Sequence, residues 1–142
     1  MELKIKKIKE NAILPKYAHN GDAGMDLFST EKYIIPPNHR VLVSTGLQVE
    51  IQKGYEMQIR PRSGLALKHG ISLPNSPGTI DSGYREELGI IIINHGSKPF
   101  TINPGDRIAQ AVINKIETPQ IIEVSELSKT PRGKGFGSSG IK

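Results

Sequence analysis

The sequence predicts a single all-β domain built as a sandwich, a barrel or a jelly roll. Several short stretches alternate apolar and polar residues with a period of two, which is typical of half-buried strands. The 142 residues include 15 Gly and 10 Pro, many of them in turn signals such as Asn103-Pro104-Gly105. Short strands separated by frequent turns indicate an all-β fold. The length fits one domain with a core of its own.

The first half of the chain shows two strand regions and then a helix. Leu3 and Ile5 alternate with lysines near the N-terminus, and valine, leucine and isoleucine alternate with other residues within 41–51. Ser63 is a good N-cap, the next residues are mostly helix formers, and Gly70 suits the position after the last turn. We therefore expect one short helix between strands.

The second half contains two further strands and an arm. Residues 88–94 form an isoleucine-rich run, as expected of a strand buried on both faces. Residues 107–116 fit a helix or a strand, but their β-branched content and the preceding turn favour a strand. Gly, Ser and Lys dominate residues 128–142. We therefore expect a β domain over residues 1–127 and a flexible arm over 128–142, mobile unless a ligand orders it.

The charge and the missing residue types exclude several classes of protein. The net charge of +5 comes from the two ends, because residues 1–10 carry +2, residues 128–142 carry +4 and the remainder carries −1. A neutral body argues against a nucleic-acid-binding face. No Cys is present, and no apolar run approaches a membrane span or a signal peptide. We expect a cytoplasmic protein that binds neither nucleic acid nor membrane.

Arg62-Ser63-Gly64, at the start of the expected helix, is a candidate phosphate site. A helix N-terminus offers free N–H groups, the guanidinium adds donors, and glycine allows close approach of the backbone. The alternative is an ordinary helix cap beside a surface arginine.

The segment from Asn75 to Tyr84 is a second candidate site. Asn75 and Gly78 suggest a tight hairpin whose backbone groups read the edge of a flat polar ring. Asp81 follows Ile80 and precedes a turn, so its carboxylate is expected at the end of a strand, facing a cleft, where it can deprotonate a water. The alternative is that Asp81 only caps the turn.

Three weaker segments complete the set. Asp26 stands among small and apolar residues and can face a site through magnesium-bound water. Arg107 and Gln110 lie on a predicted strand that follows a Gly-Asp turn, and a purely structural role is the alternative for this segment. The arm combines cations, hydroxyls and Phe136, a composition that can close over phosphates and stack on a base. Disorder is the alternative for the arm. The four histidines lack metal-ligand spacing, and no Gly-x-Ser-x-Gly, Walker A or dinucleotide motif is present.

Taken together and in this order, the five segments closely resemble those of the trimeric all-β dUTPases, from Ala23 to Gly140. The resemblance implies a jelly-roll-like distorted barrel and a homotrimer with three active sites, each built from all three chains. It implies hydrolysis of dUTP to dUMP and pyrophosphate with Mg²⁺, which limits uracil incorporation into DNA and supplies dUMP for dTMP synthesis.

The resemblance also implies a role for each site residue. Asp81 activates the water that attacks the α-phosphorus, Tyr84 packs against the deoxyribose, and Asp26 helps to place Mg²⁺ through water. The phosphate chain is held by Arg62, Ser63, Gly64 and Gln110. Uracil is bound by Asn75 and by the backbone of Gly78, Thr79 and Ile80. The arm closes over the site, with Phe136 over the uracil and Arg132, Gly137, Ser138 and Ser139 near the phosphates.

Two departures from the family pattern stand out. Glu86 replaces a glycine, so the backbone there should not need a positive φ. The arm has one residue fewer between Arg132 and Phe136, which shortens its reach by up to ~3.5 Å, so either Arg132 or Lys134 is the contact for the γ-phosphate. Two rival functions remain: a dCTP deaminase or its bifunctional form on the same fold, and a non-catalytic regulatory protein that keeps the fold.

Overall fold

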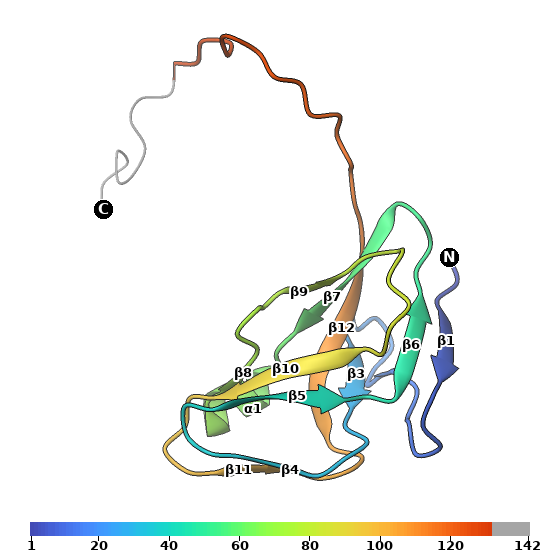
Figure 1. Cartoon of the computed structure of the whole chain (residues 1–142), viewed down its shortest axis with the longest axis vertical. Coiled ribbons are helices and arrows are strands. Elements are labelled where there is room, and N and C mark those ends of the chain that lie inside the picture. The colour runs from blue at the N-terminus through green and yellow to red at the C-terminus, as the bar shows by residue number, and fades with distance from the viewer. Residues whose placement is uncertain (132–142) are drawn as a thin grey trace.

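The computed structural model describes residues 1–131, and these fold into β-strands and one short helix (Figure 1). The elements are β1 Lys4–Lys7, β2 Lys16–Tyr17, β3 Met25–Phe28, β4 Tyr33–Ile35, β5 Arg40–Ser44, β6 Leu47–Glu50, β7 Tyr55–Arg60, α1 Ser63–His69, β8 Ile71–Ser72, β9 Gly78–Ile80, β10 Gly89–Asn94, β11 Phe100–Ile102 and β12 Arg107–Lys115. The predicted all-β class with one short helix is confirmed.

Two main sheets enclose the core. A five-stranded sheet has the order β2-β3-β12-β7-β9, and a three-stranded sheet has the order β5-β10-β8. Buried aliphatic side chains from both sheets, such as Leu27, Met57 and Ala111 from the first and Val43 and Ile90 from the second, form one cluster. Two-stranded pairs, β1-β6 and β4-β11, complete the body. Burial of this shared cluster supplies most of the driving force for folding.

The isoleucine-rich strand β10 is buried on one face, whereas burial of both faces was expected. Ile90 and Ile92 are buried, whereas Ile91 and Ile93 are only half-buried. The prediction that both faces are buried is wrong for the single chain, because the three-stranded sheet covers the core with one face only. The other face carries half-buried isoleucines and an exposed Leu42 on the neighbouring strand.

The predicted end of helix α1 is confirmed, whereas its predicted N-cap is wrong. Gly70 has φ +68° and lies at the C-cap, where its N–H donates to Ala66 O. A left-handed φ favours glycine, and a Cβ there would lie 2.8 Å from the backbone N of Gly96. Ser63 is not the N-cap, since that position belongs to Arg62, which makes no side-chain capping bond. The Ser63 hydroxyl is therefore not used to cap the helix.

The segment after Asn75 is not the predicted hairpin. Strand β8 pairs with β10, but β9 pairs with β7, so residues 73–77 cross from one sheet to the other. Strand β9 lies at the edge of the five-stranded sheet and pairs on one side only. Its three residues therefore present unpaired backbone groups along the outer edge.

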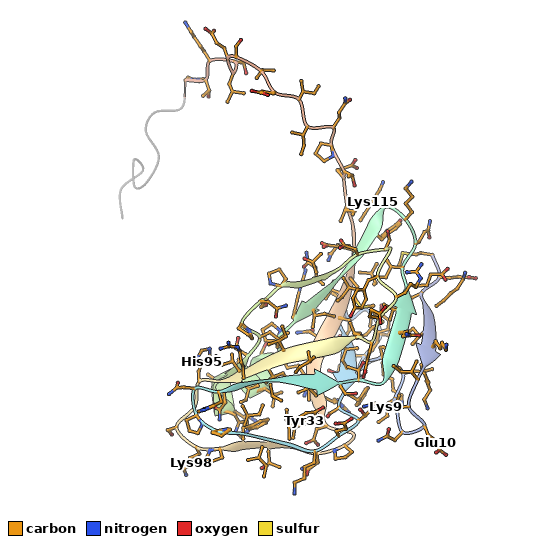
Figure 2. All side chains as sticks on the ribbon, viewed as in Figure 1. Lys9, Glu10, Tyr33, His95, Lys98 and Lys115 are labelled. Atoms are coloured by element: carbon orange, nitrogen blue, oxygen red, sulfur yellow. The ribbon has the colours of Figure 1, made fainter. Side chains whose placement is uncertain are left out.

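The chain leaves the β body after β12. The amide of Ile116 still donates to Gly54 O at 3.0 Å, and residues 117–131 then run as an exposed, extended segment that arches away from the body (Figures 1 and 2). The predicted arm from residue 128 continues this segment. Among residues 1–131 no helix has the length and apolarity needed to cross a bilayer.

Two exposed ion pairs link lysines near the N-terminus to the body. Lys9 Nζ contacts a carboxylate oxygen of Glu31, and Lys4 Nζ lies 2.8 Å from Glu50 Oε1. Hydrogen bonds from the lysines lower the pKa of both glutamates from 4.5. A carboxylate with a lowered pKa stabilises the fold above its ordinary pKa, and this contribution disappears as the pH falls through the folded-state value.

We expect Glu31→Gln to lower the melting temperature slightly at pH 7, and we expect this loss to shrink as the pH falls through the lowered folded-state pKa of Glu31, where the wild-type carboxylate becomes protonated. Thermal unfolding followed by circular dichroism over a series of decreasing pH values measures this trend. The effect at pH 7 should be small, since exposed ion pairs contribute little. An equal loss at every pH would show that the charge of Glu31 is not what stabilises the fold.

Candidate active site

A polar cavity of about 480 Å³ lies between α1 and the strands β3 and β12. Four of the predicted phosphate-binding residues and the predicted magnesium residue line it together: Arg62, Ser63, Gly64, Gln110 and Asp26. They come together because β12 pairs with β3 and places Gln110 opposite Asp26, while α1 starts directly after the neighbouring strand β7. The remaining lining residues are Ala18, His19, Asp22, Ala23, Gly24 and Arg107.

Asp26 joins two arginines in this cavity. Its Oδ1 lies 3.1 Å from Arg62 Nε, and its Oδ2 lies 3.3 Å from Arg107 Nη1. Arg62 also donates from Nη1 to the backbone oxygen of Arg107 at 3.0 Å. The Asp26 side chain is only 14% exposed, compared with 53% for Arg107. The carboxylate therefore holds two guanidinium groups at the wall of the cavity, with much of Arg107 still open to solvent.

Arg107 lies in the same predicted segment as Gln110, but the resemblance assigns it no role in the site. Its strand has a register irregularity between Arg107 and Ala109, where the pairing with β3 shifts. A bulge of this kind re-aims side chains near its position. A Gly-Asp turn before an arginine was the available signal in the sequence, but nothing in it indicates where the bulge lies.

Gln110 is held tightly in the same cavity. Its Nε2 donates to the backbone oxygen of Pro61 at 2.9 Å. A Cβ added to Gly24 would lie 2.2 Å from Gln110 Oε1, so any other residue there would require the Gln110 side chain to move. Gly64 is different, because a Cβ there would meet nothing within 4 Å. The space in front of Gly64 is therefore open to a ligand.

Overpacking at Gly24 gives a test of this geometry. We expect Gly24→Ala to displace the Gln110 amide from Pro61 O and to destabilise the protein by about 1 kcal/mol, the usual net contribution of one hydrogen bond. Denaturant unfolding measures the loss. Unchanged stability would mean that Gln110 moves aside freely and is not held by its contacts.

The predicted ring-binding and catalytic residues form a second group, on β9 and just after it. Asp81 is exposed directly after the end of the strand, and the amide of Tyr84 donates to Asp81 O at 3.1 Å. Asn75 lies over Gly78, since a Cβ on that glycine would lie 3.2 Å from Asn75 Nδ2. The Asp81 carboxylate makes no hydrogen bond within residues 1–131, so it does not cap the turn. Glu86 has no positive φ, as expected.

The two groups of residues lie far apart on one chain. Asp26 and Asp81 are separated by three strand spacings across the five-stranded sheet and by about four residues along it. Standard sheet dimensions place them about 20 Å apart. The phosphate cavity does not include Asp81 or Tyr84. On one chain the two groups of residues are therefore separate.

The predicted arm residues Arg132, Lys134, Phe136, Gly137, Ser138 and Ser139 lie outside the described residues. Their roles stay predictions.

Comparison with known proteins finds one family along most of the chain. The family model described as dUTPase matches residues 10–140. A protein of Clostridium tetani named deoxyuridine 5'-triphosphate nucleotidohydrolase is 58% identical over 97% of this chain and 96% of its own length. A protein of the same name from Crocosphaera subtropica is 54% identical over 99% of this chain and all of its own.

Solved structures of dUTPases are also similar to this chain. The dUTPase of Staphylococcus bacteriophage 80alpha with dUPNHPP is 33% identical, covers 99% of both chains and has a TM-score of 0.92. The dUTPase of phage phi11 of S. aureus, solved with a structural Mg(II) ion, is 30% identical over 91% of this chain and 100% of its own, with a TM-score of 0.84.

Proposed function

This chain belongs to the dUTPase family and hydrolyses dUTP, and from that premise we propose how its residues divide the reaction. The reaction yields dUMP and pyrophosphate by attack of water on the α-phosphorus. The cavity beside α1 binds the phosphate chain. The segment around β9 binds the nucleoside and supplies the general base that takes the proton of the attacking water. The observation that carries this proposal is the gathering of Arg62, Ser63, Gly64 and Gln110 in one open cavity.

The cavity beside α1 suits a triphosphate by its donor chemistry. A nucleoside triphosphate carries about four negative charges, and phosphoryl transfer depends mainly on positioning and on neutralising them. Arg62 and Arg107 supply guanidinium donors. The first amides of α1 have no partner within the helix. Asp26 orients the two guanidinium groups, which leaves both of its oxygens engaged.

The donor set fits a magnesium ion that is held mainly by the substrate. Residues 1–131 contain no cluster of three metal-ligating side chains. Mg²⁺ commonly keeps several waters and binds through one or two carboxylates together with substrate phosphates. Asp26, with Asp22 nearby in the same cavity, can accept hydrogen bonds from such waters. When bound, the ion neutralises part of the phosphate charge.

The segment around β9 suits a nucleobase and a sugar. The free edge of β9 presents backbone donors and acceptors, which can pair with the edge of uracil and leave a wrong base unpaired. Tyr84 is half-buried and follows Asp81 by one turn. In this proposal Tyr84 packs against the deoxyribose and leaves no room for a 2′-hydroxyl. Asp81 accepts the proton of the attacking water.

The separation of the two groups supports a site shared between copies of the chain. A triphosphate cannot contact Arg62 and Asp81 of one chain while its α-phosphorus reacts, because the Arg62 guanidinium lies against Asp26, and Asp26 is about 20 Å from Asp81 across and along the sheet. We therefore infer a site shared between copies and, as the resemblance to the family implies, a homotrimer in which the phosphate cavity of one copy faces the β9 segment of another and the arm of the third closes the site. The half-buried outer face of β10 is available to such contacts.

Pyrophosphate release from dUTP, compared with dTTP, dCTP and UTP, tests the proposed function. We expect rapid release from dUTP and at most slow release from the other three. Ammonia released from dCTP would instead identify the rival deaminase, and no release from any nucleotide would identify a non-catalytic protein. Light scattering after size exclusion measures the expected mass of three chains.

The open space at Gly64 gives a sharp variant of this test. Gly64→Ala should raise the melting temperature, since alanine stabilises a helix by up to ~1 kcal/mol over glycine. It should also raise KM for dUTP about tenfold, because the added methyl group fills the space where a phosphate is expected to approach. A stabilised variant with an unchanged KM would place the phosphates elsewhere.

A further inference from the structure

A polar cluster ties the turn between β5 and β6 to the segment after Tyr84. The hydroxyl of Ser44 donates to Glu87 Oε1, and the backbone N–H of Gly46 donates to the same oxygen at 2.9 Å. Glu87 is half-buried. Its carboxylate is therefore held by two donors from a distant part of the sequence.

Further groups stand behind Ser44 and orient it. Lys9 Nζ donates to Ser44 Oγ at 2.8 Å and contacts Glu31, and the backbone N–H of Ser44 donates to the Tyr33 hydroxyl at 3.1 Å. Figure 2 shows Lys9 and Tyr33 on the same side of the body. Glu87 contributes to the raised pKa of Lys9, after the larger effect of the Glu31 hydrogen bond. The carboxylate of Glu87 thus faces a lysine across one hydroxyl group.

Tyr84 is attached to the residue that this cluster anchors. Its hydroxyl donates to the backbone oxygen of Glu87 at 2.7 Å. The next residue, Leu88, is fully buried, and its N–H donates to Leu47 O at 2.7 Å. The far end of the Tyr84 ring is therefore fixed to a part of the backbone that cannot shift without breaking the Glu87 contacts.

We propose that Glu87 is a positioning residue for Tyr84, and that through Tyr84 it sets the preference of the site for deoxyribose over ribose. This inference rests on the proposed function, in which Tyr84 packs against the sugar. A ring held at both its backbone and its hydroxyl forms a rigid wall against a 2′-hydroxyl. When the anchor is removed, the ring can turn aside and the site admits UTP.

The experiment compares kcat/KM for dUTP and for UTP in the full-length protein. We expect Glu87→Ala to reduce the dUTP/UTP preference about tenfold, since small misplacements of positioning groups can cost up to ~10²-fold. Glu87→Gln should restore most of the preference, because its amide oxygen still accepts from Gly46. Glu50→Ala is the matched control, since it removes another paired glutamate, and it should leave the preference unchanged.

A purely structural role would predict a different result. Loss of stability alone lowers the rates with both substrates by the same factor, and an unchanged ratio in Glu87→Ala would overturn the inference. If Glu87→Ala fails to fold, the same dUTP/UTP ratio is measured in Tyr84→Phe. This variant removes only the hydroxyl and leaves the carboxylate contacts of Glu87 intact. An unchanged ratio in Tyr84→Phe overturns the inference equally. A wild-type protein without dUTP hydrolysis would instead refute the proposed function, and this inference with it.

Discussion

Asp81→Asn should lower the turnover of dUTP by ~10²–10⁴, the usual contribution of a general base. An amide has nearly the same size as the carboxylate and can still contact a water, but it cannot take a proton from it. Asp81 is exposed, and its side chain makes no hydrogen bond within residues 1–131, so the change should leave the fold intact.

Two measurements separate catalysis from binding in this variant. Pyrophosphate release gives kcat, and calorimetry with dUPNHPP, the ligand found with the phage 80alpha dUTPase, gives the dissociation constant. We expect an unchanged dissociation constant and a kcat that is lowered by ~10²–10⁴. The control Glu50→Gln neutralises an exposed carboxylate on β6 and should keep full turnover. Near-normal turnover in Asp81→Asn would remove Asp81 from the role of base.

Mixing two inactive variants should restore activity if the site is shared between chains. Arg62→Ala damages the phosphate half and Asp81→Asn the catalytic half. In a mixed trimer, a site is intact when its phosphate half comes from an Asp81→Asn chain and its catalytic half from an Arg62→Ala chain. When equal amounts of the two variants assemble at random into closed rings of three chains, about one quarter of all sites are intact in this way.

Co-expression of the two variants measures this complementation. We expect each variant alone to be nearly inactive and the mixture to reach up to about one quarter of wild-type turnover, the fraction of intact sites. A chain that carries both substitutions, mixed with wild type, is the control for unmixed trimers. No recovery in a mixture of proven mixed composition would show that each site is built within one chain, against the separation of Asp26 and Asp81 across the sheet.

Local patterns predicted the elements well, because they depend on neighbours in the sequence. The alternation in residues 41–51 became β5 and β6, and the ambiguous residues 107–116 became β12. The end of α1 at Gly70 followed from its tolerance of a left-handed φ. The start of α1 was misjudged, since a serine at the first helical position looks the same in sequence as a serine N-cap.

Long-range pairing could not be predicted in this way. The segment after Asn75 carries turn residues, yet it passes between sheets because β9 finds its partner in β7 and β8 finds its partner in β10. Arg107 entered the cavity through a register shift in β12, which depends on its pairing with β3. Glu87 gained its role from Ser44 and Gly46, which no spacing rule connects to it.

The sequence by itself determined the β class, the short helix and, through the order of five segments, the family. Those properties reside in residue types and short spacings, which the chain carries before it folds. Only the tertiary structure decided that the predicted phosphate residues share one cavity, that the Asp81 segment lies at the far edge of the same sheet, and that the Tyr84 hydroxyl bonds the backbone of Glu87. These facts depend on which strands pair, and pairing is decided by burial of the common core rather than by any one segment.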